Sequence, residues 1–321
     1  MTTRSAASSD RDATSGADTG VDVVTGAFSY SGSAIARELL AVGRQVRTLT
    51  GHPERAPENS PISAHTLTFD EPEALVEAMS GATTLYNTYW VRFAHHDTDH
   101  GLAVANSRTL FEAAKRAGIQ RIVHVSITNP SLDSPLPYFR GKALVEQHLV
   151  ATGLSHAILR PAILFGPGDV LVNNIAWLLR RMPIFAIGGH GDYRVRGIHV
   201  DDLARLCVTQ GGQRSNEVSD AVGPDRLTFT ELVTTIRAAV GSHARIVHVP
   251  GSTVPTLARV LGLALHDVLL TADEYRAMAT GLADSAAPAT GSTSVTAWLD
   301  ENGPNLGRRY ANELHRHFAT S

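Results

Sequence analysis

Apolar and polar residues follow two different periods along the first half of the chain. Short runs rich in β-branched residues alternate with longer stretches in which apolar residues recur at helical spacing. The short runs are typical of buried strands, and the longer stretches are typical of helices with one apolar face. The predicted strands are 21–25, 45–50, 64–69, 83–88, 120–126 and 155–160, and the predicted helices are 32–42, 72–80, 98–117 and 138–152.

This alternation predicts an α/β fold with a doubly wound parallel sheet, because parallel strands need crossover connections and helices supply them. After the sixth strand the pattern loosens, and segment 166–197 is rich in Gly and Arg. A helix follows over 199–208, with Asp201 or Asp202 as its predicted N-cap. Further predicted elements are strands at 217–222 and 245–249, a helix at 228–240, and a helical region over 250–321 that is interrupted at 285–294.

The order of these elements predicts two structural units. A nucleotide-binding domain covers 21–165 and is completed by 198–223. A smaller lobe, expected to hold the substrate, is built from 166–197 and 224–321. Residues 1–20 are rich in Ser, Thr, Ala and Asp and contain no apolar block, so we predict that they form a disordered tail.

Composition limits the environment and the partners of the chain. With 321 residues, of which 43% are apolar, it can bury one large core or two smaller ones. The net charge of −3 gives no sign of the basic surface that nucleic-acid binding requires. No run approaches the roughly 18 consecutive apolar residues that a membrane-spanning helix needs. The single cysteine, Cys207, excludes an intrachain disulfide and lies on an apolar helical face, which is typical of buried filler. We therefore expect a cytoplasmic protein whose partners are a small-molecule substrate and, as one option, a second copy in a homodimer.

The first predicted strand runs into a turn of small residues, here called the glycine turn (residues 25–32). A strand, a tight turn and a helix N-terminus bring backbone N–H groups and the positive end of a helix dipole to one point, which suits a pyrophosphate. Gly26 permits the tight turn, and Gly32 lets the helix pack closely on the strand. Ser29 stands where a middle glycine is expected, and its hydroxyl can bond a phosphate. The alternative is an ordinary connection between a strand and a helix.

The end of the second strand bears on the type of dinucleotide. A carboxylate about 20 residues past the glycines bonds the ribose 2′-hydroxyl of NAD. The corresponding place is near Thr50, where the sequence has no acid. Arg47, His52 or Arg55 could face a 2′-phosphate there instead. The sequence therefore predicts NAD(P) as the cofactor, with a slight preference for NADP.

Tyr138 and Lys142 form the strongest candidate for acid–base chemistry. Residues four apart lie on one face of a helix, and a neighbouring ammonium lowers the pKa of a phenol, which suits it to proton transfer. The chain contains 7 Tyr but only the two lysines Lys115 and Lys142, so a chance Tyr-x-x-x-Lys pair is rare. We predict that Tyr138 transfers a proton.

In order and spacing, these motifs resemble the short-chain dehydrogenase/reductase superfamily, in particular its extended and atypical branches, which include nucleotide-sugar epimerases and dehydratases and NmrA-like proteins. The resemblance covers roughly residues 21–240 and implies a Rossmann fold. Besides the glycine turn and the Tyr138–Lys142 pair, it rests on Asp70, Asn106, the helix end at 113–118, and the segments 124–126, 159–161, 165–169 and 199–204.

The resemblance implies a role for each matching residue. Tyr138 would donate or accept the proton, and Lys142 would bond the nicotinamide ribose and tune Tyr138. Ser126 would hydrogen-bond the substrate oxygen, with Thr128 as the alternative. Asp70 would meet the adenine, unless it is the N-cap of the helix that follows it. The complete predicted set of cofactor-binding residues is Gly26, Phe28, Ser29, Tyr30, Gly32, Thr50, Asp70 and Lys142.

Two further stretches invite interpretation. Four aromatic residues within 86–93 follow the carboxyl end of a strand, which predicts a substrate wall, and the alternative is that they seal the core under a loop. The acidic and histidine residues between His95 and His100 resemble a metal cluster only superficially. We predict a solvated loop and a helix N-terminus there, without a metal.

These observations predict an NAD(P)-dependent oxidoreductase that moves a hydride between nicotinamide and a carbonyl or alcohol carbon, with Tyr138 handling the proton. One alternative is a nucleotide-sugar epimerase or dehydratase that retains its NAD. Another is a non-catalytic NAD(P)-binding sensor or assembly factor, similar to NmrA-type regulators or to the dehydrogenase-like accessory subunit of respiratory complex I. The Tyr138–Lys142 pair argues against a sensor, and the lack of an evident clamp for a sugar nucleotide argues against an epimerase.

Overall fold

The computed structural model describes residues 20–92 and 99–312, so the predicted tail lies, apart from Gly20, outside the described residues. Within the described ranges, seven strands form one parallel sheet in the order β11-β6-β5-β4-β1-β2-β3. These strands are β1 (Val21–Thr25), β2 (Gln45–Thr50), β3 (Ser63–Thr66), β4 (Ala82–Asn87), β5 (Arg121–Val125), β6 (Ser155–Pro161) and β11 (Glu217–Ala221).

The strand order reverses direction between β1 and β4, which lie side by side at the centre of the sheet. In the register, Val24 of β1 faces Thr48 of β2 on one side and Tyr86 of β4 on the other. Ligands of such sheets bind outside the carboxyl ends of the strands at this reversal point. The glycine turn leaves β1 at that edge.

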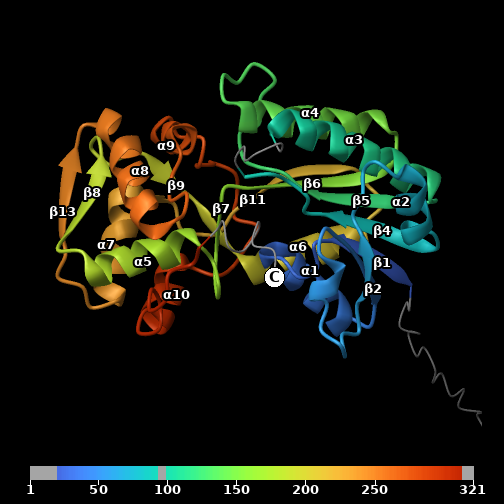
Figure 1. Cartoon of the computed structure of the whole chain (residues 1–321), viewed down its shortest axis with the longest axis horizontal. Helices are drawn as coiled ribbons and strands as arrows, with labels where there is room; N and C mark the ends of the chain where they lie inside the picture. Colours follow the sequence, from blue (N-terminus) through green and yellow to red (C-terminus); the bar gives the residue numbers. More distant parts are fainter. Residues whose placement is uncertain (1–19, 93–98, 313–321) are drawn as a thin grey trace, which may run out of the picture.

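Helices cover both faces of the sheet (Figure 1). On one face, α1 (Tyr30–Ala41) and α6 (Val200–Gly211) pack in one hydrophobic cluster with Val24. On the other face, α2 (Pro72–Met79), α3 (His100–Arg116) and α4 (Pro137–Ala151) pack in a second cluster with Val23. Neighbouring residues of β1 thus face opposite layers, and the predicted doubly wound α/β fold is confirmed.

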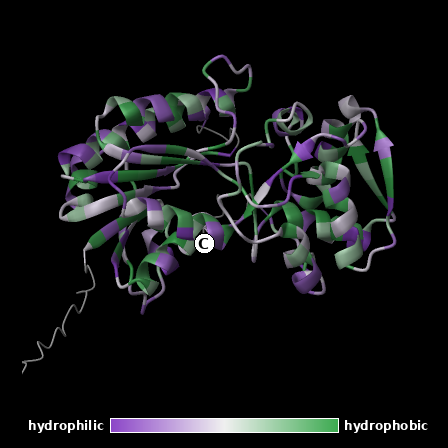
Figure 2. Ribbon diagram, turned by 180° about the vertical axis from the view of Figure 1, so that it is seen from behind, coloured by the Kyte–Doolittle hydropathy of each residue, from purple (hydrophilic) through white to green (hydrophobic). Residues whose placement is uncertain are grey.

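A separate hydrophobic cluster forms the core of a second region, here called the C-terminal lobe. Figure 2 shows many hydrophobic residues on its helices. Its helices are α5 (Leu171–Arg181), α7 (Phe229–Ala239), α8 (Val254–Leu265), α9 (Ala272–Ala279) and α10 (Val295–Asn302). Parallel strands β8 (Ile184–Gly188) and β13 (Arg245–Val249) pair at its far edge, and the shorter pairs are β7 (Ile163–Phe165) with β10 (Gly197–His199) and β9 (Arg194–Val195) with β12 (Leu227–Thr228).

Residues 198–223 return from this lobe to the sheet, where β11 pairs with β6 and α6 packs against α1. The division into two domains itself stays a prediction. Cys207 of α6 is fully buried, as predicted for filler, and burial raises the pKa of its thiol. Across the described ranges, no helix combines the length and the apolar character that crossing a bilayer requires.

The predicted N-cap of α6 is wrong. His199 is the N-cap, and its Nδ1 atom accepts a hydrogen bond from the Asp201 N–H at 3.2 Å. Asp202 instead accepts hydrogen bonds from the N–H groups of Ser292 and Thr293, at 3.0 and 2.7 Å. Its carboxylate therefore anchors a distant loop beside α6.

Candidate functional site

The glycine turn has the geometry that its sequence predicts. Gly26 lies in the left-handed region with a φ of +64°, and its N–H donates to the Leu49 carbonyl oxygen at 2.8 Å. A Cβ atom on Gly32 would overlap the Gly26 carbonyl oxygen, so only glycine lets α1 approach the turn this closely. Ser29 is the N-cap of α1, its side chain makes no capping hydrogen bond, and the first helical turn contains no acid.

A cavity of about 1880 Å³ opens at this turn and continues into the C-terminal lobe. Of the predicted cofactor-binding residues, Gly32, Asp70 and Lys142 do not line it. Asp70 is exposed, and Glu71 takes the N-cap position of α2, so the alternative capping role for Asp70 is wrong. The lining at this end comprises Gly26, Phe28, Ser29, Tyr30, Ser33, Thr50, His52 and Arg55.

These residues fit the phosphate half of a dinucleotide. The N-terminus of α1 meets the cavity at Ser29 and Tyr30, and its dipole favours an anion there because no acidic side chain of the first turn opposes it. The close approach of Gly32 to Gly26 brings this helix end directly over the turn.

The structure reduces the number of basic residues that could contact the 2′-phosphate of NADP. The Arg47 guanidinium donates to the carbonyl oxygens of Ala78 and Ser80, at 3.2 and 2.7 Å, and so holds the end of α2. His52 and Arg55 both line the cavity close to Thr50 in sequence. The two remaining basic candidates are therefore His52 and Arg55.

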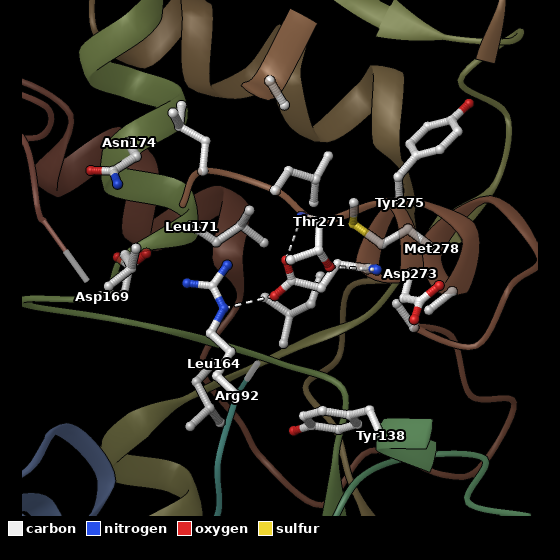
Figure 3. A pocket seen from close by; sticks show the side chains of 18 of the residues that line it. Arg92, Tyr138, Leu164, Asp169, Leu171, Asn174, Thr271, Asp273, Tyr275 and Met278 are labelled. Carbon is white, nitrogen blue, oxygen red and sulfur yellow. Dashed lines mark hydrogen bonds and ion pairs between the residues drawn. The ribbon is translucent and has the colours of Figure 1, made fainter. Parts of the chain in front are cut away.

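Tyr138 occupies the first turn of α4 and lines the same cavity (Figure 3). Its ring packs edge-on against Trp90 and His100, with centroid distances of 5.6 and 5.5 Å. Burial and the Glu274 carboxylate raise the pKa of the phenol, and Arg92 opposes them. Tyr138 therefore keeps its proton near neutral pH and can act as a donor.

Lys142 is buried and does not line the cavity. Its Nζ atom donates to the Val125 carbonyl oxygen at 3.0 Å and lies 4.6 Å from the centroid of the Trp90 ring. Burial lowers its pKa to about 7, against the attraction of Glu146. The charges that shift the pKa of Tyr138 are those of Glu274 and Arg92. The predicted tuning of Tyr138 by Lys142 therefore stays a prediction.

The Trp90 indole contacts both Tyr138 and Lys142. It stacks on His100 with an interplanar angle of 3°, and a Cβ atom on Gly141 would come within 2.9 Å of it. Gly141 lies between Tyr138 and Lys142 in the sequence, and its missing side chain makes the space for the indole. The Nε1 atom of Trp90 is buried and has no hydrogen-bond partner within residues 20–92 and 99–312.

The prediction of an aromatic substrate wall is wrong for the three aromatic residues that the structure describes. Tyr86 is buried in the core, and its hydroxyl lies against Gly211. The Tyr89 hydroxyl accepts a hydrogen bond from Asn106 at 2.9 Å. Tyr89 and Trp90 are half-buried, and none of the three lines the cavity. The fourth aromatic residue, Phe93, lies outside the described residues.

Neither candidate for the substrate oxygen lines the cavity, and both hydroxyls are bonded to other groups. The Ser126 hydroxyl donates to Glu146 at 2.5 Å, and Glu146 is paired with Arg160. The Thr128 hydroxyl donates to the Leu282 carbonyl oxygen at 2.9 Å. The charged side chains and the histidine that line this part of the cavity are Arg92, Asp99, His100, Arg140, Asp273 and Glu274.

Asp99 is the N-cap of α3, and its carboxylate accepts a hydrogen bond from the Leu102 N–H at 2.7 Å. This agrees with the predicted helix N-terminus. Residues 95–97 of the superficial metal cluster lie outside the described residues, and no group of three or more metal-ligating side chains occurs in the part that the structure describes.

The depressed pKa of Lys142 predicts a pH dependence of stability. The lysine titrates near 10.5 when exposed and near 7 in the folded protein, so the unfolded chain binds the extra proton between these values. The free energy of unfolding should therefore rise with pH across this window. Urea unfolding at both ends of the window should show this rise in the wild type and in Lys115→Met, whereas Lys142→Met should lose it. An equal rise in Lys142→Met would contradict the lowered pKa of Lys142 in the folded protein.

Comparison with known proteins finds a family whose model matches part of this chain. Residues 26–172 match the model of a family described as NAD(P)H-binding. The matched region begins at the glycine turn, includes Tyr138 and Lys142, and ends in the first turn of α5.

The curated relatives include an enzyme and a subunit of a respiratory complex. The 2-alkyl-3-oxoalkanoate reductase of Stenotrophomonas maltophilia (strain K279a) is 26% identical, over 68% of this chain and 76% of that protein. The mitochondrial NADH dehydrogenase (ubiquinone) 1 alpha subcomplex subunit 9 of Arabidopsis thaliana is 24% identical, over 72% of this chain and 60% of that protein. The match thus spans less than two thirds of the plant protein.

Among solved structures, the triphenylmethane reductase of Citrobacter sp. complexed with NADP(H) has the same fold. The TM-score is 0.74, with 19% sequence identity over 88% of this chain and 99% of that one. The likeness extends over the C-terminal lobe as well as the sheet.

Proposed function

We propose that this chain, which belongs to the extended, NAD(P)-binding type of the short-chain dehydrogenase/reductase family, interconverts a carbonyl compound and its alcohol with NAD(P)(H). One observation carries the proposal: a single cavity joins the glycine turn at Gly26 to Tyr138 and continues into the C-terminal lobe. The cavity can therefore hold a dinucleotide and a second molecule with a proton donor beside it.

The chemistry divides between cofactor and protein. When bound, NAD(P)H supplies a hydride to the carbonyl carbon, the C=O double bond becomes a single bond, and the oxygen takes up a proton. The Tyr138 hydroxyl supplies that proton, because burial raises its pKa and keeps it protonated near neutral pH. Lys142 is buried, bonded to the Val125 carbonyl oxygen and packed against Trp90, so a ribose contact by Lys142 requires these side chains to rearrange.

The direct test is a cofactor titration followed by turnover. Calorimetry with NAD(H) and NADP(H) measures binding, and a panel of carbonyl compounds is then followed by nicotinamide absorbance. Consumption of NAD(P)H that depends on a carbonyl compound supports the proposal. Tight cofactor binding without turnover of any compound in the panel contradicts it.

Cofactor preference is testable at the end of β2. Thr50→Asp should move the ratio of dissociation constants toward NAD by about ten-fold, the equivalent of about 1.4 kcal/mol, because a carboxylate accepts from the 2′-hydroxyl and repels a 2′-phosphate. Thr66→Asp is the matched control, since Thr66 pairs with Thr50 on the neighbouring strand and is exposed outside the cavity. Calorimetry with both cofactors gives the ratio. An unchanged ratio in Thr50→Asp would show that the adenosine ribose does not bind at the end of β2.

A second candidate function is a non-catalytic NAD(P)-binding protein, such as a subunit or an assembly factor of a larger complex. The observation that favours it is the packing of the site: Trp90 packs against Lys142, and the hydroxyls of Ser126 and Thr128 are engaged elsewhere. Such a protein would bind the cofactor without turnover. An epimerase, in contrast, would retain NAD through purification, which denaturation and nucleotide analysis would reveal.

A further inference from the structure

We infer that the substrate carries a long alkyl chain and that a channel between α5, β8 and α8, here called the alkyl channel, holds this chain. The inference rests on the proposed function, because it assigns the substrate of the same cavity. It concerns the part of the cavity beyond Tyr138, where the C-terminal lobe supplies the walls.

One wall of the alkyl channel is an apolar stripe along α5. Leu171, Ile175, Leu178 and Met182 all line the cavity, and their spacing of three and four residues places them on one face of the helix. The stripe runs from the first residue of α5 to the residue that ends it. With 11 residues, α5 is roughly 16 Å long. The channel is therefore long compared with a single sugar ring.

The opposite wall and the floor are also apolar. From α8, Val254, Leu257, Ala258, Leu261 and Ala264 line the cavity, again over the whole helix. From β8, Ile184, Phe185 and Ala186 contribute, and this strand contacts both helices. Figure 1 shows the three elements together at the end of the molecule that is remote from the glycine turn.

The polar groups of these walls are already engaged. Both helices lie wholly within the described residues, and Asn174 is the one polar side chain that they contribute to the lining. Its amide donates to the Ala311 carbonyl oxygen and accepts from the Ala311 N–H, each at 2.9 Å. A sugar would lose hydration here without gaining hydrogen bonds, whereas an alkyl chain gains by leaving water.

The distribution of charged side chains along the cavity determines which end of the substrate lies beside Tyr138. Charged side chains gather at the Tyr138 end of the channel, where Arg92 pairs with Glu274 at 2.7 Å (Figure 3). This pair balances its own charge, and the other charged residues that line this end, Asp99, Arg140 and Asp273, include both signs. The site therefore suits an uncharged polar head such as a carbonyl. The carbonyl end then lies beside Tyr138, and the chain extends away along α5.

The far end of the channel opens through an apolar rim. Met182, Ile184, Leu257 and Val260 line the cavity and are nevertheless between 42% and 62% exposed. A chain longer than the channel can pass through this rim. Affinity should therefore rise with chain length and then level off.

Equilibrium dialysis with radiolabelled butanol, octanol and dodecanol tests the channel without any turnover. We expect affinity to rise by about four-fold per methylene group, the equivalent of about 0.8 kcal/mol, until the channel is filled. Radiolabelled UDP-glucose is the competing class and, with the glycine turn saturated by NADP(H), should bind more weakly than dodecanol. This series on the wild-type protein needs no variant to fold.

A filling variant locates the site. Ala258→Trp places an indole in the channel and should weaken dodecanol binding by about ten-fold or more while leaving butanol nearly unchanged. Thr256→Trp is the matched control on the same helix, since Thr256 is exposed and lies outside the lining. It should stay within about two-fold of the wild type.

The outcomes separate this inference from the proposed function. Equal affinities for the three alcohols, stronger binding of UDP-glucose, or unchanged dodecanol binding in a folded Ala258→Trp variant would each overturn the alkyl channel. If carbonyl compounds are reduced without dependence on chain length, the channel fails and the reductase stands. If dodecanol binds as expected and no aldehyde is reduced, the channel stands and the reductase fails.

Discussion

Tyr138→Phe should lower turnover by roughly 10²–10⁴-fold, the range of general acid–base catalysis, while dinucleotide affinity stays within a few-fold. The ring and its contacts with Trp90 and His100 remain, so the substitution removes the proton and little else. The measurement is steady-state kinetics with the best carbonyl compound of the panel, together with calorimetry for the cofactor.

Tyr89→Phe is the matched control for this substitution. It also removes a phenolic hydroxyl, but one that is bonded to Asn106 away from the cavity, so turnover should change little. A Tyr138→Phe enzyme that turns over like the wild type would refute the catalytic assignment.

The pH profile gives an independent readout of the same group. Because burial raises the pKa of Tyr138, loss of its proton should not slow carbonyl reduction below pH 10, the ordinary value for a tyrosine. A decline that begins near pH 7 would instead follow Lys142. Lys142→Met should remove such a decline, whereas Lys115→Met should leave it in place.

The nucleotide-binding half of the fold could be predicted because its signals are local. Every strand and helix predicted between residues 21 and 160 is present, with ends shifted by no more than a few residues. Each pattern can be recognised from a few neighbouring residues: the apolar run of β1, the small residues of the glycine turn, and the helical spacing after Ser33. Parallel pairing then follows from the crossover helices.

The C-terminal lobe was harder to predict, because its segments pair with segments that are distant in the sequence. The sequence assigns segment 166–197 to the smaller lobe but predicts no helix or strand within it, yet it forms α5, β8 and β9. The helical spacing from Leu171 to Met182 is the signal that could have revealed α5. β8 also had a local signal, the apolar run 184–187 between Pro183 and Gly188, but nothing local showed that it pairs with β13 about 60 residues later.

The arrangement of side chains at the site was the least predictable level. The spacing of Tyr138 and Lys142 placed both on α4, and that placement is confirmed. It could not show that Trp90, from the connection after β4, would pack against both. Nor could it show that Glu146 would bind the Ser126 hydroxyl, because that contact also involves Arg160 on another element. Such contacts depend on packing across the fold, which local patterns do not encode.

Gly26→Asp should abolish measurable dinucleotide binding, for NAD and NADP alike. The Gly26 backbone has a φ of +64°, which a residue with a Cβ rarely adopts, and that Cβ would lie 3.1 Å from the Ser29 hydroxyl oxygen. The added carboxylate would also repel the pyrophosphate at the N-terminus of α1. Calorimetry with both cofactors measures the loss.

Gly118→Asp is the control that separates lost binding from lost folding. Gly118 has a φ of +83° and open space around it, so it carries comparable backbone strain and the same added charge. It follows α3, away from the cavity, and its variant should lose some thermal stability but keep its cofactor affinity. Ser29→Gly should likewise keep that affinity, and a large loss there would show that the hydroxyl itself holds a phosphate. If a folded Gly26→Asp variant retains its affinity for both cofactors, the dinucleotide does not bind at the glycine turn.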